Sequence, residues 1–198
     1  MKNRKASVKR KTKETDITVS VNIDGSGALR GVTGVGFFDH MLELLARHSL
    51  MDLNLKVAGD LKVDAHHTVE DVGIVLGMAL DKALGNRKGI RRYGWAIVPM
   101  DEALAEAVID LGGRPYFSYR VKLPGARAKV GSFDVELVQE FFQALAFNAK
   151  MNLHMSLRTG KNLHHIAEAL FKGFARAFDQ AAGKDDRIKD VPSTKGTL

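Results

Sequence analysis

The sequence predicts an α+β protein of two pseudo-repeated halves, each a mostly antiparallel sheet with helices packed on one side. Three observations support this prediction. The order helix, strand, turn, helix occurs twice, and each second helix opens with the motif His-His-x-x-Glu. Between the helices, apolar and polar residues alternate as in half-buried strands. The hydrophobic content of 45% is enough for a core. Neither half can bury its faces alone, so we expect the halves to pack together.

The elements follow the same order in each half. The first half, about 14–95, is expected to hold strands at 17–23 and 53–57 and helices at 37–48 and 66–85. The second half, about 96–185, is expected to hold strands at 95–99, 103–111, 116–122 and 151–157, a helix at 134–148, and a helix from 164 to Gly183. Asp64 can cap the helix that begins at His66. A polar tail, 186–198, completes the predicted domain of 14–198.

The two halves align through their motifs. His66 aligns with His164 and Glu70 with Glu168 at an offset of 98, and His40 aligns with Glu140 at an offset of 100. The second half therefore offers a carboxylate where the first offers an imidazole. His154 aligns with Asn54 on the polar face of a strand, so we expect it at the surface or behind the site.

The net charge of +7 comes from one segment. Residues 1–13 hold seven of the 30 basic residues and no acidic one, which leaves 23 basic against 23 acidic residues elsewhere. Such an arm can bind nucleic acid or another anion. It lacks the interleaved aromatic residues that single-strand binding uses, so we expect a disordered, solvated extension.

Several classes of protein and site are excluded by composition. The absence of cysteine rules out disulfides, zinc-thiolate sites and cysteine nucleophiles. No apolar run approaches the length of a membrane span, and no signal-peptide core is present at the N-terminus. We therefore expect a cytoplasmic protein.

The repeated motif predicts metal binding. On a helix its first histidine and its glutamate share a face, and its second histidine lies about 100° round. Two copies with two ligand directions each suit two ions, and imidazole with carboxylate fits Mn, Fe, Zn, Ni or Co. The candidate ligands are His40, His66, His67, Glu70, Glu140, His164, His165 and Glu168. His48 follows His40 on the same helical stripe and is either a core or a substrate-side histidine.

Basic residues in loops form a second group. Arg92, Arg114, Lys172 and Lys195 could bind a phosphate, and the hydroxyls of Ser193 and Thr194 lie beside Lys195. Lys172 stands two turns beyond His164 on roughly the same helical face, which connects the basic group to the metal ligands.

Four segments resemble the imidazoleglycerol-phosphate dehydratase family of histidine biosynthesis. They are Phe38-Asp39-His40-Met41-Leu42, Asp64 to Asp71 (DAHHTVED), His164 to Lys172 (HHIAEALFK) and Pro192-Ser193-Thr194-Lys195-Gly196. The resemblance runs from about residue 14 to the C-terminus and leaves the basic arm outside. It implies a ribosomal protein S5 domain 2-like fold and a lyase that dehydrates imidazole glycerol phosphate to imidazole acetol phosphate.

The resemblance also implies cofactors, assembly and residue roles. Two manganese ions would bind the substrate imidazole or imidazolate, in sites formed between subunits of a 24-subunit shell. Seven of the candidate ligands are carried over by motif, and Glu140 stands at the eighth ligand position, where the family commonly has histidine. The phosphate pattern falls on Arg92, Arg114, Lys172, Ser193 and Lys195, and 186–198 becomes a substrate-binding tail. The acid/base glutamate falls on Glu14. The candidate catalytic residues are Glu14, His48, Glu70 and Glu168.

Two other functions remain open. A dinuclear metallohydrolase of a phosphoester would also use a metal pair and a cationic clamp, although such sites are usually richer in aspartate. A nucleic-acid-binding α+β domain would account for the basic arm, but it gives no reason for two metal-type motifs in a neutral folded part.

Overall fold

The described residues form two halves with the same order of elements, apart from two short extra strands in the second half. The structure, a computed structural model, describes residues 4–125 and 128–198. The first half contains β1 (Lys5–Lys11), β2 (Thr15–Asn22), β3 (Leu29–Arg30), α1 (Gly36–Ser49), β4 (Asp52–Gly59) and α2 (His66–Leu84). The second contains β5 (Tyr93–Met100), β6 (Ala103–Asp110), β7 (Tyr116–Arg120), β8 (Lys129–Val130), β9 (Phe133–Asp134), α3 (Leu137–Asn148), β10 (Asn152–Thr159) and α4 (Leu163–Ala182).

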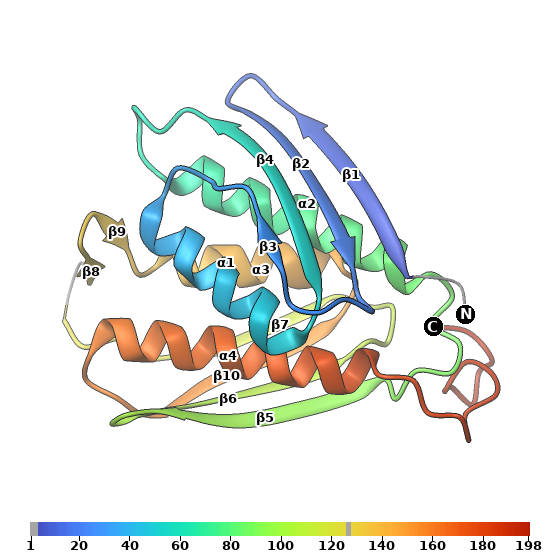
Figure 1. The fold of residues 1–198 in the computed structure, drawn as a ribbon. Helices are drawn as coiled ribbons and strands as arrows, with labels where there is room; N and C mark the ends of the chain where they lie inside the picture. Colours follow the sequence, from blue (N-terminus) through green and yellow to red (C-terminus); the bar gives the residue numbers. More distant parts are fainter. Residues whose placement is uncertain (1–3, 126–127) are drawn as a thin grey trace.

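Each half forms a four-stranded sheet, and the helices lie between the two sheets (Figure 1). The strand orders are β1-β2-β4-β3 and β5-β6-β10-β7. In both sheets the first three strands are antiparallel, and the last is parallel to its neighbour. The short strands β8 and β9 form a separate hairpin. The predicted α+β class, with mostly antiparallel sheets covered by helices on one side, is confirmed.

The helices join the halves into one core. Helix α2 packs on the first sheet and on α3 of the second half, while α4 packs on the second sheet and on α1 of the first half. Phe38 of α1 lies 5.2 Å from Phe141 of α3, and Phe142 lies 4.7 Å from Phe171 of α4, measured between ring centroids. Each such buried ring stabilises the fold by about 1.5–3 kcal/mol. This cross-packing brings α1 beside the motif at the start of α4.

Strand β1 corrects the prediction of a disordered arm. It pairs with β2 along its whole length, from Lys5 opposite Asn22 to Lys11 opposite Asp16. Its charges have acidic partners, because Arg10 contacts Asp71 at 2.6 Å and Lys9 contacts Asp16 at 3.1 Å. The first repeat therefore begins at β1 and the second at β5. The predicted first repeat, 14–95, leaves out β1, and the predicted second repeat, 96–185, leaves out the first residues of β5. Of the predicted arm, residues 1–3 lie outside the described residues.

The helices differ little from their predicted extents. Helix α3 begins at Leu137 rather than 134, because Phe133 and Asp134 pair with Lys129 and Val130 in the β8–β9 hairpin. Within the part of the chain that the structure describes, no helix combines the length and the apolar character needed to cross a bilayer.

Candidate metal centre and phosphate pocket

The first turn of α4 is fixed by an N-cap. The side-chain oxygen of Asn162 accepts hydrogen bonds from the backbone N–H groups of His164, at 2.9 Å, and His165, at 3.3 Å. The cap satisfies donors that have no partner within the helix. Helical spacing then places His164 and Glu168 on one face and turns His165 away from them.

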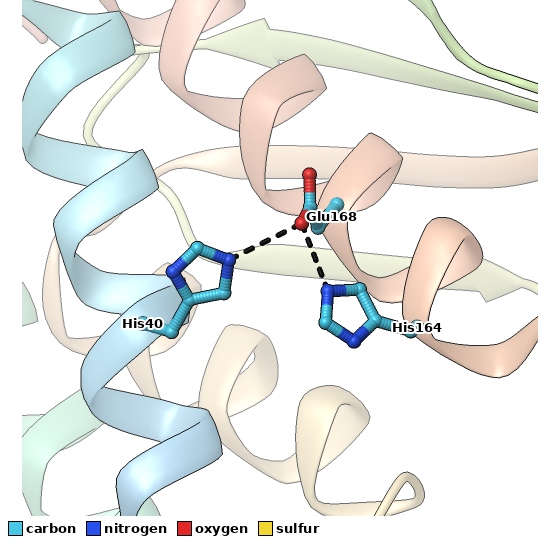
Figure 2. A group of neighbouring side chains, drawn as sticks. All are labelled: His40, His164 and Glu168. Carbon is cyan, nitrogen blue, oxygen red and sulfur yellow. Dashed lines mark hydrogen bonds and ion pairs between the residues drawn. The ribbon is translucent and has the colours of Figure 1, made fainter.

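Three side chains from two helices meet beside this turn. One carboxylate oxygen of Glu168 lies 2.9 Å from Nε2 of His164 and 3.2 Å from Nε2 of His40, which projects from α1 (Figure 2). The three ligand atoms lie within 4.8 Å of one another, a spacing that could hold a metal ion. The group draws on both halves of the chain, since α1 belongs to the first and α4 to the second.

Glu168 is held as a carboxylate. It is 7% exposed, and burial alone would raise its pKa. The hydrogen bonds from Lys172, His40 and His164 outweigh burial and lower the pKa to about 2. Lys172 bonds to Oε2, the oxygen that does not contact the histidines. Glu168 is therefore ionised at neutral pH, with Oε1 directed at the imidazoles.

The motif of α2 lies at the surface. Nε2 of His66 is 3.8 Å from a carboxylate oxygen of Glu70, and both side chains are more than 40% exposed. Asp64 was predicted to cap this helix; the N-cap residue is Ala65, and Asp64, one residue earlier, accepts a 2.7 Å hydrogen bond from the backbone N–H of His66. Among residues 4–125 and 128–198, the metal-type group contains only His40, His164 and Glu168, so the α2 ligands are not part of it.

The second histidine of each motif contacts carboxylates from loops. Nδ1 of His67 lies 2.9 Å from Asp60, and its Nε2 lies 4.0 Å from Glu14. In the other half, Nδ1 of His165 lies 2.8 Å from Glu102, and its Nε2 lies 3.6 Å from Asp101. Sequence reasoning proposed Glu14 but missed the other three carboxylates.

These contacts shift the pKa values of both partners. The hydrogen bond with Asp60 raises the pKa of His67, and the hydrogen bond with Glu102 raises the pKa of His165. The pKa of Glu102 falls to about 2, first through His165 and then through backbone N–H groups of Asn162 and Lys161. Each imidazole thus has a charged acceptor at Nδ1.

Three further candidate residues lie apart from the metal-type group. Glu140 is half-buried in the first turn of α3. His154 is exposed on β10, with its ring centroid 5.3 Å from that of Tyr116, as expected for a residue outside the site. His48 is half-buried on α1, and burial lowers its pKa, with further lowering by the charges of Lys172 and Arg176.

A pocket of about 590 Å³ gathers most of the predicted phosphate ligands. It is lined by Arg92, Tyr93, Arg114, Pro192, Ser193, Thr194, Lys195, Thr197 and Leu198. Arg92 forms hydrogen bonds of 2.7 and 3.1 Å with Asp110, and it donates another, of 2.9 Å, to the carbonyl of Pro192. Arg92 thereby holds the C-terminal tail against the pocket.

Lys172 is not in this pocket. Its ammonium group bonds to Glu168, four residues earlier on α4, and to the sulfur of Met100. The ion pair along the helix directs Lys172 to the metal-type group, on the helical face expected from its spacing to His164, and its predicted contact with phosphate stays a prediction.

The duplicated α+β fold and the histidine–carboxylate group define a class of protein, a two-repeat α+β protein with a candidate metal site. Residues 33–178 match the family model described as imidazoleglycerol-phosphate dehydratase. The chain belongs to this family, and it is an enzyme of the hydro-lyase class. The resemblance read from the four motifs is confirmed.

Similar proteins cover the whole chain. The imidazoleglycerol-phosphate dehydratase of Acetivibrio thermocellus is 59% identical over 196 residues, which cover 99% of this chain and 100% of the relative. That of Geobacter sulfurreducens is 57% identical with the same coverage. The solved structure of the Staphylococcus aureus enzyme matches with a TM-score of 0.82 and 40% identity, covering 91% of this chain and 99% of that one. The Pyrococcus furiosus enzyme, in complex with (S)-C348, has the same TM-score at 36% identity, covering 96% and 100%.

Proposed function

We propose that this enzyme removes water from imidazole glycerol phosphate to give imidazole acetol phosphate, for histidine biosynthesis in the cytoplasm, with two manganese ions per chain. The observation that carries the proposal is the group formed by His40, His164 and Glu168. The named relatives support the substrate, and the tail pocket with its arginines supports binding of its phosphate.

The side chains of the group fit a divalent transition metal. They offer imidazole nitrogen and carboxylate oxygen, and the chain has no sulfur ligand of the cysteine type. The lowered pKa of Glu168 supplies the ionised form that coordination needs. His40, His164 and Glu168 would hold one ion.

Pseudo-symmetry supports a second ion. Helix α1 packs on α4, and its counterpart α3 packs on α2. The position of His40 on α1 corresponds to that of Glu140 on α3, so Glu140 would serve His66 and Glu70 as His40 serves His164 and Glu168. A carboxylate at this position retains an oxygen donor that suits manganese.

The remaining ligands suggest an assembled site. His67 and His165 point toward the loop carboxylates, away from the first histidines of their motifs, and are partly exposed at 37% and 25%. We propose that they complete the sites of neighbouring subunits in a 24-subunit shell. A single chain would then hold its ions with incomplete sets of ligands.

Bound divalent ions would supply Lewis acidity to the nitrogens of an imidazole ring. The chain's own residues account for the other needs of a dehydration, in which one C–H and one C–O bond break. Arg92, Arg114 and Lys195 would bind the phosphate and fix the substrate in register. Glu14 is 54% exposed and faces Nε2 of His67, so it can take the proton and pass it on. Lys172 keeps Glu168 oriented toward the histidines.

Metal analysis coupled to a dehydratase assay tests the proposal. We expect close to two manganese ions per chain, loss of activity on chelation, and a particle far larger than 21.7 kDa in light scattering. Glu168→Gln should lower metal occupancy. Full activity in a metal-free chain would refute the proposal. Release of inorganic phosphate without the ketone product would favour the phosphoester hydrolase instead.

A further inference from the structure

The second histidine of each motif has a carboxylate at Nδ1, and the two halves take it from different places. In the first half it is Asp60, from the turn after β4, at 2.9 Å from His67. In the second half it is Glu102, from the hairpin between β5 and β6, at 2.8 Å from His165. Neither carboxylate belongs to the group of metal-type ligands.

We propose that Asp60 and Glu102 are positioning residues that hold the Nδ1 proton of His67 and His165, so that each Nε2 is presented as a metal donor. The inference rests on the proposed function, because it takes these two histidines to be metal ligands. A neutral imidazole carries one proton, and a carboxylate at Nδ1 fixes that proton there. The lone pair is then at Nε2.

Glu102 is well placed for this role. Its Oε1 accepts the backbone N–H groups of Lys161, at 3.0 Å, and Asn162, at 2.7 Å. These bonds tie it to the turn that leads into α4, and they leave Oε2 for His165. One carboxylate therefore sets both the start of the helix and the orientation of its second imidazole.

The strand registers show that Glu14 and Glu102 correspond to each other in the two halves. Asn22 pairs with both Lys5 and Asp52, and Asp110 pairs with both Tyr93 and Asn152. These registers align Thr15 with Ala103, one residue after Glu14 and Glu102. The two glutamates therefore occupy equivalent positions.

The turns before the motif helices decide what each glutamate does. The turn Gly160-Lys161-Asn162 has no acidic residue, so Glu102 is the carboxylate that accepts the hydrogen bond from Nδ1 of His165. In the first half the turn supplies Asp60, which accepts the hydrogen bond from Nδ1 of His67. Glu14 is therefore left at the Nε2 edge of His67, 4.0 Å away and 54% exposed. In the first half Asp60 therefore occupies the place at Nδ1 that Glu102 occupies in the second.

Glu102→Gln separates positioning from packing. The amide oxygen can keep the two backbone hydrogen bonds, which turns the NH₂ group toward Nδ1 of His165. An amide donor at Nδ1 places the ring proton on Nε2 and blocks it as a ligand. Glu106→Gln is the matched control, because Glu106 lies on β6, four residues after Glu102, but bonds Ser156 and Arg158. Asp60→Ala is the second variant and removes the acceptor of His67.

The test strips metal from the full-length oligomers and titrates them with Mn²⁺, following free Mn²⁺ by electron paramagnetic resonance. We expect about a 10- to 100-fold weaker Kd for one of the two ions in Glu102→Gln and in Asp60→Ala. Glu106→Gln should match the wild type. Excess Mn²⁺ should restore activity to Glu102→Gln.

The outcomes separate this inference from the proposed function. Wild-type Mn²⁺ affinity in both variants, beside an active and metal-loaded wild type, would overturn the positioning role alone. A wild type that binds no Mn²⁺ would overturn both. If Glu102→Gln does not fold, the Mn²⁺ affinity of Asp60→Ala decides the question for its half.

Discussion

The Asn162 cap offers a test of how far one residue controls the metal centre. In Asn162→Ala, the backbone N–H groups of His164 and His165 lose their side-chain acceptor. Both histidines stand in the turn that the cap stabilises. We therefore expect fold stability and metal affinity to fall together.

The structure sets the size of this effect. Both hydrogen bonds are exposed, so water replaces the lost acceptor, and the cost should be near the middle of the range for N-caps, about 1 kcal/mol. In a chain of this length, about 1 kcal/mol lowers the Tm by roughly 2–4 °C. If the whole cost falls on the first turn, its folded population changes by at most about fivefold, and the Kd for Mn²⁺ rises by no more than this factor.

Thermal unfolding of the metal-free protein and a Mn²⁺ titration would measure the two effects. Asn162→Ser is the conservative control, because serine caps about as well as asparagine and adds no charge. It should restore both the Tm and the Kd. If Asn162→Ala leaves both values at those of the wild type, the cap does not hold the ligand turn, and the reasoning is refuted.

Three further predictions concern other parts of the chain. Deleting residues 1–11 should destabilise the protein by about 3 kcal/mol or more in chemical denaturation, because it removes β1 and leaves the 10%-exposed Asp71 without Arg10. Arg114→Met should raise the KM about 10- to 100-fold with unchanged Mn²⁺ content, because a charged hydrogen bond to phosphate is lost. Asp52 accepts N–H groups of Ser26 and Ala28, which lower its pKa from 3.8 to about 2, so its stabilisation is present above about pH 5 and lost as the pH falls through 2. Asp52→Asn should therefore cost about 1 kcal/mol at pH 7, and its gap to the wild type should close toward pH 2 in denaturation curves.

Local patterns made much of the site predictable. The spacing of HHxxE fixes which side chains share a helical face, and it placed His164 with Glu168. Aligning the repeats added His40, which the structure brings to 3.2 Å from Glu168. The spacing also placed Lys172 on the His164 face, and the structure adds its ion pair with Glu168, four residues earlier on the helix.

Contacts between residues far apart in the sequence could not be predicted from such local patterns. Strand β1 looked like a charged tail because its partners, such as Asp71, come from a helix some sixty residues later. Asp60 and Glu102 reach their histidines only when loops and helix starts meet in the folded chain. The importance of Glu102 could nevertheless have been predicted from the sequence, because extending the repeat alignment through the strands aligns Glu102 with Glu14.

Duplication and asymmetry have separate consequences for the proposed chemistry. Two equivalent motif helices give the chain two sets of imidazole and carboxylate ligands, which suits two ions. A dehydration also needs a carboxylate that is free to exchange a proton, and a strictly symmetric chain would use both glutamates as hydrogen-bond acceptors for histidine. The turn that carries Asp60 breaks the symmetry around the two glutamates. Glu102 is engaged by His165 and two backbone N–H groups, whereas Glu14 remains exposed beside the proposed ligand His67. We therefore expect proton transfer to belong to the first half alone.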